Sequence, residues 1–198
     1  MYILDLHLFL FVIILMFLFG MTVIICKKKK TKYRRLFYFL IEIYCLLMVK
    51  VVVMPIVLLN AVSRHDFIKH LGRKVIYGIQ TIPFQTIKSN LTPITFAGII
   101  QIFGNIILLM PVAIIIVWII EEKNIIFVLS LGLFVSIIVE GMQYIINALT
   151  LYPSHEVDVD DLILNYLGYI LMIGVIYIIK RKNINVYNKV RKMFVINE

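Results

Sequence analysis

Charged residues are scarce in this sequence: they make up 16% of its 198 residues, whereas hydrophobic residues make up 62% and the mean hydropathy is +1.00. A soluble domain is about half apolar and about a quarter charged. A chain of this size leaves roughly a third of its unfolded surface exposed after folding, so it cannot hide this much apolar surface from water. Disorder is excluded as well, because disordered chains are poor in aliphatic and aromatic residues. The remaining apolar surface must face lipid.

The sequence also lacks the motifs of several common sites. Its two cysteines, Cys26 and Cys45, lie in apolar runs, which indicates reduced packing residues and implies neither a disulfide nor a metal framework. It contains no nucleophile elbow, no glycine-rich phosphate loop and no HExxH motif. Basic residues outnumber acidic ones by 20 to 11, but they flank apolar stretches, as in membrane proteins. Nucleic acid is therefore not predicted as a partner, whereas membrane lipid is.

Five apolar runs are long enough to cross a bilayer, which takes about 20 apolar residues. They predict an all-α, polytopic membrane protein with about five transmembrane helices. The first run could also be a cleaved signal peptide, although no positively charged region precedes it and no small-residue cleavage pattern follows it. The runs are Leu6–Cys26, Leu36–Leu59, Phe96–Ile120, Ile125–Ile146 and Leu162–Ile179.

The loop charges predict the orientation, because cytoplasmic loops carry an excess of Lys and Arg. With five spans, seven basic residues in Lys27–Arg35, one at Lys123 and six beyond Ile179 share one side of the membrane. The other side has five in Asn60–Thr95 and none in Asn147–Asp161. We therefore expect an integral membrane protein with its N-terminus outside and its C-terminus inside, in the cytoplasm.

The segment Asn60–Thr95 is too interrupted to be a further span. Its apolar residues recur at helical spacing with basic residues between them over Phe67–Ile76, which predicts an amphipathic helix in the outer interface. The following Ile79–Ile87 is expected to form a turn against the membrane. The predicted organisation is an N-terminal helix and basic loop (1–35), a membrane domain (36–180) and a basic cytoplasmic tail (181–198).

Polar and ionisable residues inside the spans cost free energy and need a reason. Lys50, Asn105 and Glu140 fall at one depth on three spans, roughly 21–22 Å from the inner edge at about 1.5 Å per residue. We expect them to meet in the interior of the bundle, with an ion pair between Lys50 and Glu140. The alternative is that Lys50 extends outward to the interface.

Helical spacing extends these positions into polar stripes on three spans. Such stripes predict a hydrated crevice that opens to the outside. The alternative is that the side chains form interhelical hydrogen bonds that hold the bundle together. The stripes comprise Gln101 and Asn105; Ser136, Glu140, Gln143 and Asn147; and Asp161, Asn165 and Gly168.

The strongest local pattern is the run Ser154–Asp161, which holds four carboxylates and a histidine in seven residues. A helix cap accounts for one carboxylate, because caps accept hydrogen bonds from free N–H groups, but it does not account for four. Asp158, Asp160 and Asp161 could hold a divalent cation such as Mg²⁺ or Ca²⁺, or the acids could bind a cationic ligand. Neither EF-hand spacing nor a zinc pattern is present.

Four motifs occur in a fixed order: Ile82–Ile87, Gly104–Pro111, Ser136–Gln143 and Asp158–Gly168. In this order and spacing they resemble the VanZ-like family of bacterial membrane proteins. The resemblance implies a small multi-helix protein of Gram-positive type, and the family's named member is associated with teicoplanin resistance. It also implies a binding site of Pro83, Phe84, Asn105, Pro111, Glu140, Gln143, Asp158, Asp160, Asp161 and Asn165.

One position departs from the family pattern. Where the family often has an arginine, three residues before the first aspartate, this chain has His155. If the arginine balances the acid cluster, the charge here would depend on pH near about 6–7.

Two functions fit these features. The first is a non-enzymatic envelope protein that binds an amphiphile at the outer leaflet, such as a lipoglycopeptide or a lipid-linked cell-wall precursor, and confers low-level glycopeptide resistance. The second is an intramembrane enzyme acting on a lipid or such a precursor, with Glu140 as general acid or base and a divalent metal at Asp160 and Asp161. No other cofactor is implied. A transporter is disfavoured by the absence of inverted repeats, and a pore formed by an oligomer stays open.

Overall fold

The computed structural model describes residues 2–5, 32–60, 79–120 and 124–194, with a few positions between them (14, 16–18, 20, 65, 66 and 69). Most of the described residues are helical, as predicted. The predicted first span, Leu6–Cys26, and the predicted amphipathic helix, Phe67–Ile76, lie largely outside the described residues, so both stay predictions.

Three segments among the described residues are long and apolar enough to cross a membrane: Phe96–Trp118, Ile125–Thr150 and Val159–Lys182. They coincide with the last three predicted spans. The first consists of helix α6 (Phe96–Leu108) and helix α7 (Met110–Ile120), and the other two are α8 (Ile125–Thr150) and α9 (Val159–Lys182). Pro111 explains the interruption between α6 and α7, because proline has no N–H and its ring clashes with the carbonyl one turn before it.

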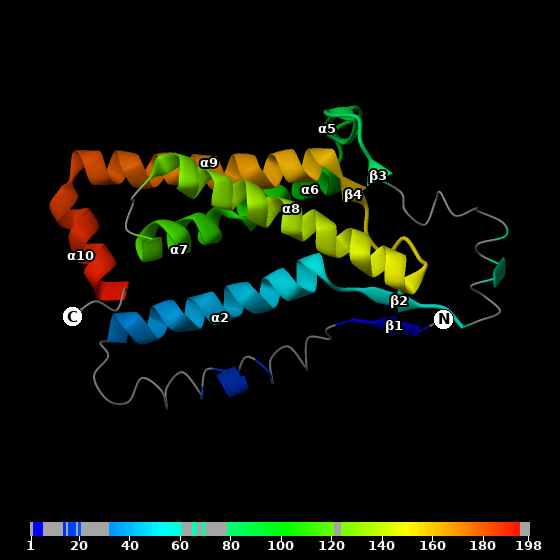
Figure 1. Cartoon of the computed structure of the whole chain (residues 1–198), viewed down its shortest axis with the longest axis horizontal. Helices are drawn as coiled ribbons and strands as arrows, with labels where there is room; N and C mark the ends of the chain where they lie inside the picture. Colours follow the sequence, from blue (N-terminus) through cyan, green and yellow to red (C-terminus); the bar gives the residue numbers. More distant parts are fainter. Residues whose placement is uncertain are drawn as a thin grey trace.

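The second predicted span, Leu36–Leu59, is not one continuous helix. Helix α2 (Lys32–Val52) ends before Pro55, and strand β2 (Ile56–Leu58) follows it. Proline disfavours helical geometry in the residue before it and cannot donate a hydrogen bond. The 21 residues of α2 would measure about 31 Å, and the helix lies beside the bundle in Figure 1. A span through α2 therefore stays a prediction.

Two short sheets lie at one end of the molecule, so the described fold is not purely helical (Figure 1). Strand β1 (Tyr2–Leu4) pairs antiparallel with β2. Strand β3 (Ile79–Gln80) pairs in parallel with β4 (Val157–Asp158), and the short helix α5 (Gln85–Leu91) follows β3. We call this end, defined by β3, α5 and β4, the sheet end.

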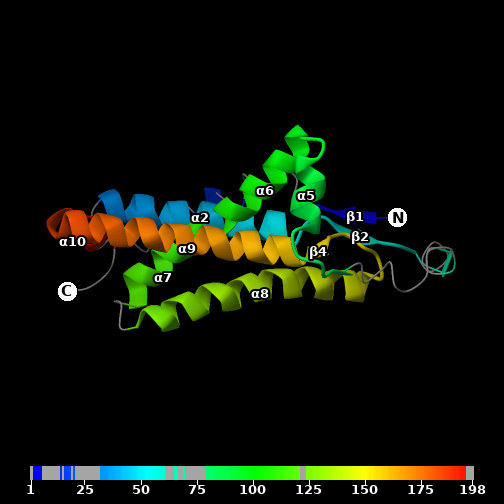
Figure 2. The same ribbon diagram turned by 90° about the horizontal axis from the view of Figure 1, so that it is seen from above.

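Helix α9 is the centre of the bundle, and α6, α7 and α8 all pack on it. The segment α6–α7 crosses α9 obliquely (Figure 2). At the crossing, a Cβ added to Gly168 would come 1.7 Å from the carbonyl oxygen of Ile106. On the other side, the Tyr169 hydroxyl donates to the Val128 carbonyl at 2.7 Å, and its ring covers Gly132. Small residues thus bring three helices close together, as is usual inside membranes.

The opposite end carries helix α10 (Ile184–Phe194), which turns across the end of the bundle (Figure 1). Its Arg191 donates from Nε and Nη2 to the Trp118 carbonyl at 3.4 and 3.3 Å. The predicted basic tail therefore begins as a folded helix. We call this the basic end, because Lys180–Phe194 contains no acidic residue and six basic ones: Lys180, Arg181, Lys182, Lys189, Arg191 and Lys192.

The outer surface of the bundle is apolar. Large hydrophobic side chains such as Phe96, Ile126, Phe134 and Ile178 are exposed on α6, α8 and α9. Several polar residues of α8 and α9 are buried instead, among them Ser136 and Asn165. A bundle with an apolar outer surface and with polar groups buried among its core residues is stable in lipid rather than in water.

Candidate functional site

The carboxylate of Asp160, at the start of α9, is fully buried and lies at the centre of the site. Its Oδ1 accepts a hydrogen bond from the Phe84 N–H at 2.5 Å, and its Oδ2 accepts from the N–H groups of Thr86 and Ile87 at 2.8 and 3.0 Å. These N–H groups begin α5 and have no partner within that helix. Asp160 therefore caps a helix that lies more than seventy residues earlier in the chain.

The local backbone explains why α5 needs this distant cap. Phe84 occupies the N-cap position of α5 with a φ of 67°, in the left-handed region that residues other than glycine rarely adopt. Its side chain has no oxygen with which to cap the helix. The turn that contains Pro83 and Phe84 is thus held in place by Asp160, and two of the four motifs form one structural unit.

Asp158 connects three segments at the sheet end. Its Oδ1 accepts from the Asp160 N–H at 2.8 Å and from Gln80 Nε2 at 3.1 Å. Its own N–H donates to Glu140 Oε2 on α8 at 3.2 Å. Gln80 Nε2 also donates to the Ile82 carbonyl at 2.8 Å, and the Ile82 N–H donates back to Gln80 Oε1. Gln80 was not predicted as a site residue, because its only signal in the sequence is a polar side chain three residues before Pro83.

The acidic residues form a cluster without a basic partner. Glu140, Asp158 and Asp160 are buried, and the half-buried Asp161 interacts with the side chain of Gln101. Within the described residues, none of these carboxylates takes part in an ion pair. Backbone N–H groups stabilise the buried charges instead, and the site as a whole stays electronegative.

The cluster does not form the metal site predicted for Asp158, Asp160 and Asp161. Both oxygens of Asp160 and one of Asp158 accept hydrogen bonds from N–H donors of the protein. In the part of the chain that the structure describes, no three His, Cys, Asp or Glu side chains are grouped so that they could hold a metal ion. Ca²⁺ and Mg²⁺ need about six or more oxygen ligands, so these residues do not fit such an ion.

The predicted ion pair between Lys50 and Glu140 is wrong. Lys50 Nζ lies 3.8 Å from Asp5 Oδ1, and Glu140 faces the backbone of Asp158. Helix α2 runs unbroken from Leu36 to Lys50, so the height of Lys50 along the helix is kept, but its side chain is directed to Asp5. Lys50 is therefore in the last turn of α2, beside the first strand, and is only partly buried.

The polar stripes face the interior as predicted, and several members act as interhelical contacts. Ser136 Oγ donates to the Leu162 carbonyl at 2.9 Å. Asn147 makes two hydrogen bonds with the His155 backbone, at 2.7 and 3.1 Å. Gln101 Oε1 accepts from Asn90 Nδ2 at 3.1 Å. Ser136, Asn147 and Gln101 therefore form hydrogen bonds that hold the bundle together, which was the alternative to a hydrated crevice.

Three other amide side chains keep buried polar atoms that have no hydrogen-bond partner among the residues that the structure describes. They are Asn105 Nδ2 on α6, Gln143 Oε1 on α8, and both polar atoms of Asn165 on α9. Asn165 is only 1% exposed. A buried amide atom that stays unsatisfied costs about 1–3 kcal/mol, so these three side chains lower the stability of the bundle interior. Pro111 does not belong to this site, because it faces α2 in a different cavity.

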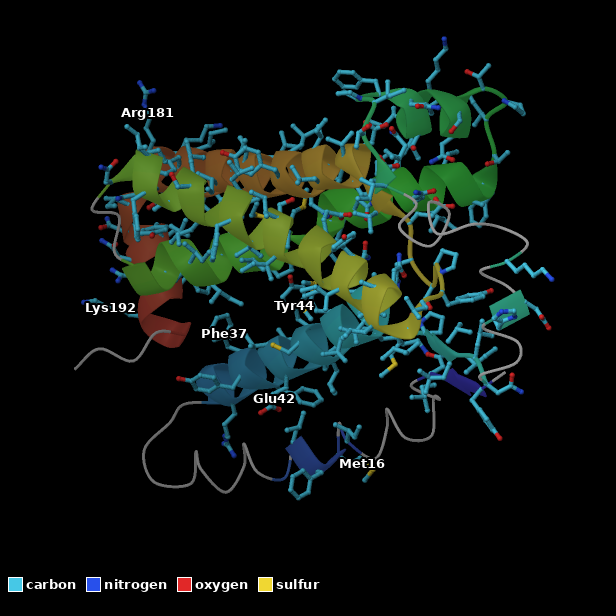
Figure 3. All side chains as sticks on the ribbon, turned by 45° about the vertical axis from the view of Figure 1, so that its right-hand side comes forward. Met16, Phe37, Glu42, Tyr44, Arg181 and Lys192 are labelled. Atoms are coloured by element: carbon cyan, nitrogen blue, oxygen red, sulfur yellow. The ribbon has the colours of Figure 1, made fainter. Side chains whose placement is uncertain are left out.

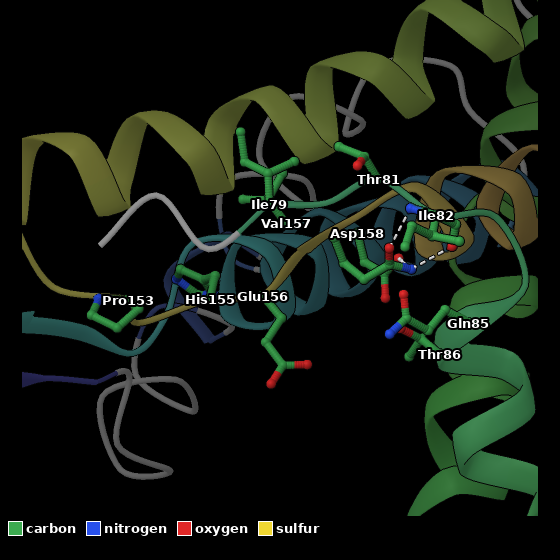
Figure 4. A pocket seen from close by; sticks show the side chains of 11 residues that line it. Ile79, Thr81, Ile82, Gln85, Thr86, Pro153, His155, Glu156, Val157 and Asp158 are labelled. Atoms are coloured by element: carbon green, nitrogen blue, oxygen red, sulfur yellow. Dashed lines mark hydrogen bonds between the residues drawn. The ribbon is translucent and has the colours of Figure 1, made fainter. Parts of the chain in front are cut away.

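A cavity of about 560 Å³ opens at the sheet end beside the acid cluster (Figure 4). The segments of β3 and β4, the turn after β3 and the loop before β4 form its walls. Next to it, Ile82 is 62% and Phe84 63% exposed, so the cavity borders apolar surface. Its polar lining residues are Gln80, Thr81, Gln85, Thr86, His155, Glu156 and Asp158, of which His155, Glu156 and Asp158 belong to the acidic run singled out from the sequence.

His155 does not act as a charged counterpart of the acids. Its Nε2 lies 3.2 Å from the Val53 carbonyl, which joins the loop before β4 to the end of α2. Burial lowers the pKa of His155 below its ordinary value and outweighs the hydrogen bond to Val53, which acts in the opposite direction. The imidazole is therefore neutral at pH 7.

We expect the folded protein to lose stability in weak acid through His155. Because the pKa of His155 is lower in the folded state than in the unfolded state, the unfolded state binds the extra proton more readily once the pH falls below about 6.5. The loss is at most about 1.4 kcal/mol per pH unit. Thermal unfolding of the wild type and of His155→Gln between pH 7.5 and 5.5 measures it as the difference between the two proteins. The wild type should lose stability relative to His155→Gln as the pH falls, whereas substitution of the exposed His65 should give no such difference.

Comparison with known proteins identifies the chain. The family model described as VanZ/LLP1 matches residues 41–180. The chain belongs to the VanZ/LLP1 family. The match includes most of α2, all of α6–α8 and every candidate site residue, and it ends within α9. Comparisons with curated proteins and with solved structures give no match. Family membership and the apolar helices together indicate a membrane protein related to VanZ.

Proposed function

We propose that this VanZ/LLP1-family protein binds an amphiphilic ligand of the cell envelope in the cavity at its sheet end. The observation that carries the proposal is the position of this cavity. The cavity has a polar wall with acidic residues, and exposed apolar side chains border it. The outer surface of the protein beyond them is apolar as well. A ligand with a polar, cationic head and an apolar chain matches both surfaces at once.

The electrostatics of the wall favour an amine-bearing head. Glu156 and Asp158 line the cavity, and Glu140, Asp160 and Asp161 lie behind it. The carboxylates of Glu156 and Asp158, which have no ion-paired basic partner among the described residues, attract positive charge. The amide and hydroxyl groups of Gln80, Gln85 and Thr86 can hydrogen-bond the rest of the head group.

The apolar border favours a ligand with an acyl chain. Ile82 and Phe84 project from the turn before α5, where they would meet the hydrocarbon of the outer leaflet if the sheet end faces outward, as the loop charges predict. A lipoglycopeptide of the teicoplanin type carries both an amino group and an acyl chain. A lipid-linked cell-wall precursor has the same division into a polar head and an apolar chain. Either ligand would link the protein to low-level glycopeptide resistance.

The proposal predicts selective protection of a sensitive Gram-positive host. Expression of the wild-type protein should lower susceptibility to teicoplanin more than to vancomycin, which has no acyl chain. Glu156→Gln should remove much of this protection, because it neutralises an exposed carboxylate of the cavity wall and should weaken ligand binding by about tenfold. Minimal inhibitory concentrations and binding to the purified protein in nanodiscs measure the two effects.

Asp66→Asn is the matched control, because Asp66 is also an exposed acid in the predicted outer part of the chain but does not line the cavity. A membrane blot checks that all variants are expressed equally. Equal protection by the wild type and Glu156→Gln, or none by either, would contradict a binding role for this cavity. Loss of binding on addition of a chelator would instead favour the metal-dependent enzyme.

A further inference from the structure

A second cavity, of about 370 Å³, lies between α2 and α7, away from the sheet-end site. Leu40 and Ile41 of α2 form one wall, and Pro111, Ile114 and Trp118 of α7 form the other. Its volume is within the usual range for ligand sites, about 300–1,000 Å³. We call it the α2–α7 groove.

The groove is suited to a hydrocarbon chain. Its lining side chains are aliphatic or aromatic, and the hydroxyl of Tyr44 is engaged by the Leu108 carbonyl at 2.7 Å. Water would gain few hydrogen bonds in such a space, whereas each methylene buried there contributes about 0.8 kcal/mol. Pro111 lines this groove and also interrupts the helix at Leu109. The Leu108 carbonyl, which accepts the hydrogen bond from Tyr44, is adjacent to this interruption.

One end of the groove leads to the basic end of the bundle. Phe37 and Trp118 mark this end, with ring centroids 5.4 Å apart. Arg191 of α10 binds the Trp118 carbonyl. Figure 3 shows Phe37 and Tyr44 along α2 and Lys192 on α10 at the Phe37 end. An apolar slot that ends beside cationic side chains has the charge pattern of an anionic lipid site.

Helix α10 itself has the properties of an interfacial helix. It lies across the end of the bundle, with the buried Tyr187 facing inward under Lys180, whose Nζ is 5.6 Å from the ring centroid. Lys189 and Lys192 are exposed. A basic amphipathic helix in this position lies at the level of the lipid head groups. The acidic pair Glu121 and Glu122, which follows α7, does not offset the six basic residues of the α9–α10 segment.

The geometry points to a phospholipid-binding site: an acyl chain of an anionic phospholipid occupies the α2–α7 groove, and its phosphate lies against Lys189 and Lys192. This site is at the opposite end of the bundle from the cavity proposed to bind an envelope amphiphile. It does not depend on that proposal, and its occupant belongs to the other leaflet.

Binding to the purified full-length protein tests the site, with phosphatidylglycerol and phosphatidylcholine of identical chains as probes. Native mass spectrometry should show one phosphatidylglycerol retained in preference to phosphatidylcholine. Leu40→Trp fills the groove from α2 and should weaken retention by at least about tenfold. Leu47→Trp is the matched control, because Leu47 is on the same helix and similarly exposed (46% against 52%) but does not line the groove.

A second pair of variants tests the head group. Lys189→Gln combined with Lys192→Gln should lower the preference for phosphatidylglycerol by about fivefold per lysine, which corresponds to about 1 kcal/mol each. Lys88→Gln at the sheet end should leave it unchanged. Glycerol phosphate without acyl chains should not compete, whereas competition by it would show a free phosphate site and overturn the proposal.

Three further outcomes would also overturn it. Equal retention of both lipids by the wild type would remove the argument from charge. Equal effects of Leu40→Trp and Leu47→Trp would show that the groove is not the site. If no lipid is retained and Leu40→Trp converts a dimer into a monomer, a second copy of the chain occupies the groove instead.

Discussion

Gly168→Ala is expected to separate α6 from α9 and to lower the free energy of unfolding by about 3 kcal/mol, at the upper end of the cost of overpacking. The new Cβ would lie 1.7 Å from the carbonyl oxygen of Ile106 and 2.6 Å from its carbonyl carbon. Both are backbone atoms of a packed helix, so no side-chain rotation can relieve the contact. The helix axes must move apart, and neighbouring contacts are lost with them.

The matched control is Gly174→Ala on the same helix. Within 4 Å of its added Cβ there is no atom outside the helix's own backbone, and alanine is favoured over glycine in a helix interior by about 0.5–1 kcal/mol. Thermal unfolding of the two purified variants in the same detergent should therefore shift in opposite directions. Equal midpoints would show that α6 and α9 do not pack at Gly168 in the folded protein.

The same substitution should disturb the polar interior. Asn105 is adjacent to Ile106, and Asn165 lies one turn from Gly168, so a shift of α6 moves the two amides relative to each other. The glycine of the fourth motif is thus explained by helix packing beside the site.

Asp160→Asn is expected to release the turn that contains Pro83 and Phe84 and to destabilise the protein by about 3–5 kcal/mol. The aspartate accepts three backbone N–H bonds, each of which is strengthened by its charge. An asparagine in its place has one oxygen and turns an NH₂ group toward N–H donors. The start of α5 then keeps buried N–H groups without acceptors, which is costly.

Limited proteolysis and thermal unfolding measure this effect together. Asp160→Asn should expose Ile79–Leu91 to cleavage and lower the unfolding midpoint. Glu156→Gln, four residues earlier and exposed, should do neither. If Asp160→Asn keeps the wild-type proteolysis pattern and midpoint but abolishes function, Asp160 acts on a ligand and is not a helix cap.

The two proposals fail in different ways. The loss of antibiotic protection in Glu156→Gln tests the cavity at the sheet end, whereas the loss of lipid retention in Leu40→Trp tests the α2–α7 groove. Gly168→Ala and Asp160→Asn test the framework on which the sheet-end site depends. A result for the sheet-end site therefore does not decide whether the α2–α7 groove binds lipid.

Much of the architecture follows from the amino-acid sequence because hydrophobicity is a local property that adds up along the chain. The runs at Phe96–Ile120, Ile125–Ile146 and Leu162–Ile179 have the length of a membrane span, and the structure has helices at all three. The start of α9 was also predictable, since aspartate is a preferred N-cap residue. The side chain of Asp158 accepts a hydrogen bond from the Asp160 N–H. The inward direction of the polar stripes followed from helical spacing alone.

Which polar group meets which was decided only by the tertiary structure. Four carboxylates in sequence suggested one metal site, but β4 and the first turn of α9 point them in different directions, toward Gln80, α5 and Gln101. Depth along ideal spans suggested that Lys50 meets Glu140, but the Lys50 side chain lies beside Asp5, and Glu140 accepts from the Asp158 N–H. Spacing along a chain determines the face and approximate height of a side chain. Its partner is on another helix, and it depends on where helices end, where they cross and which backbone N–H groups are left free.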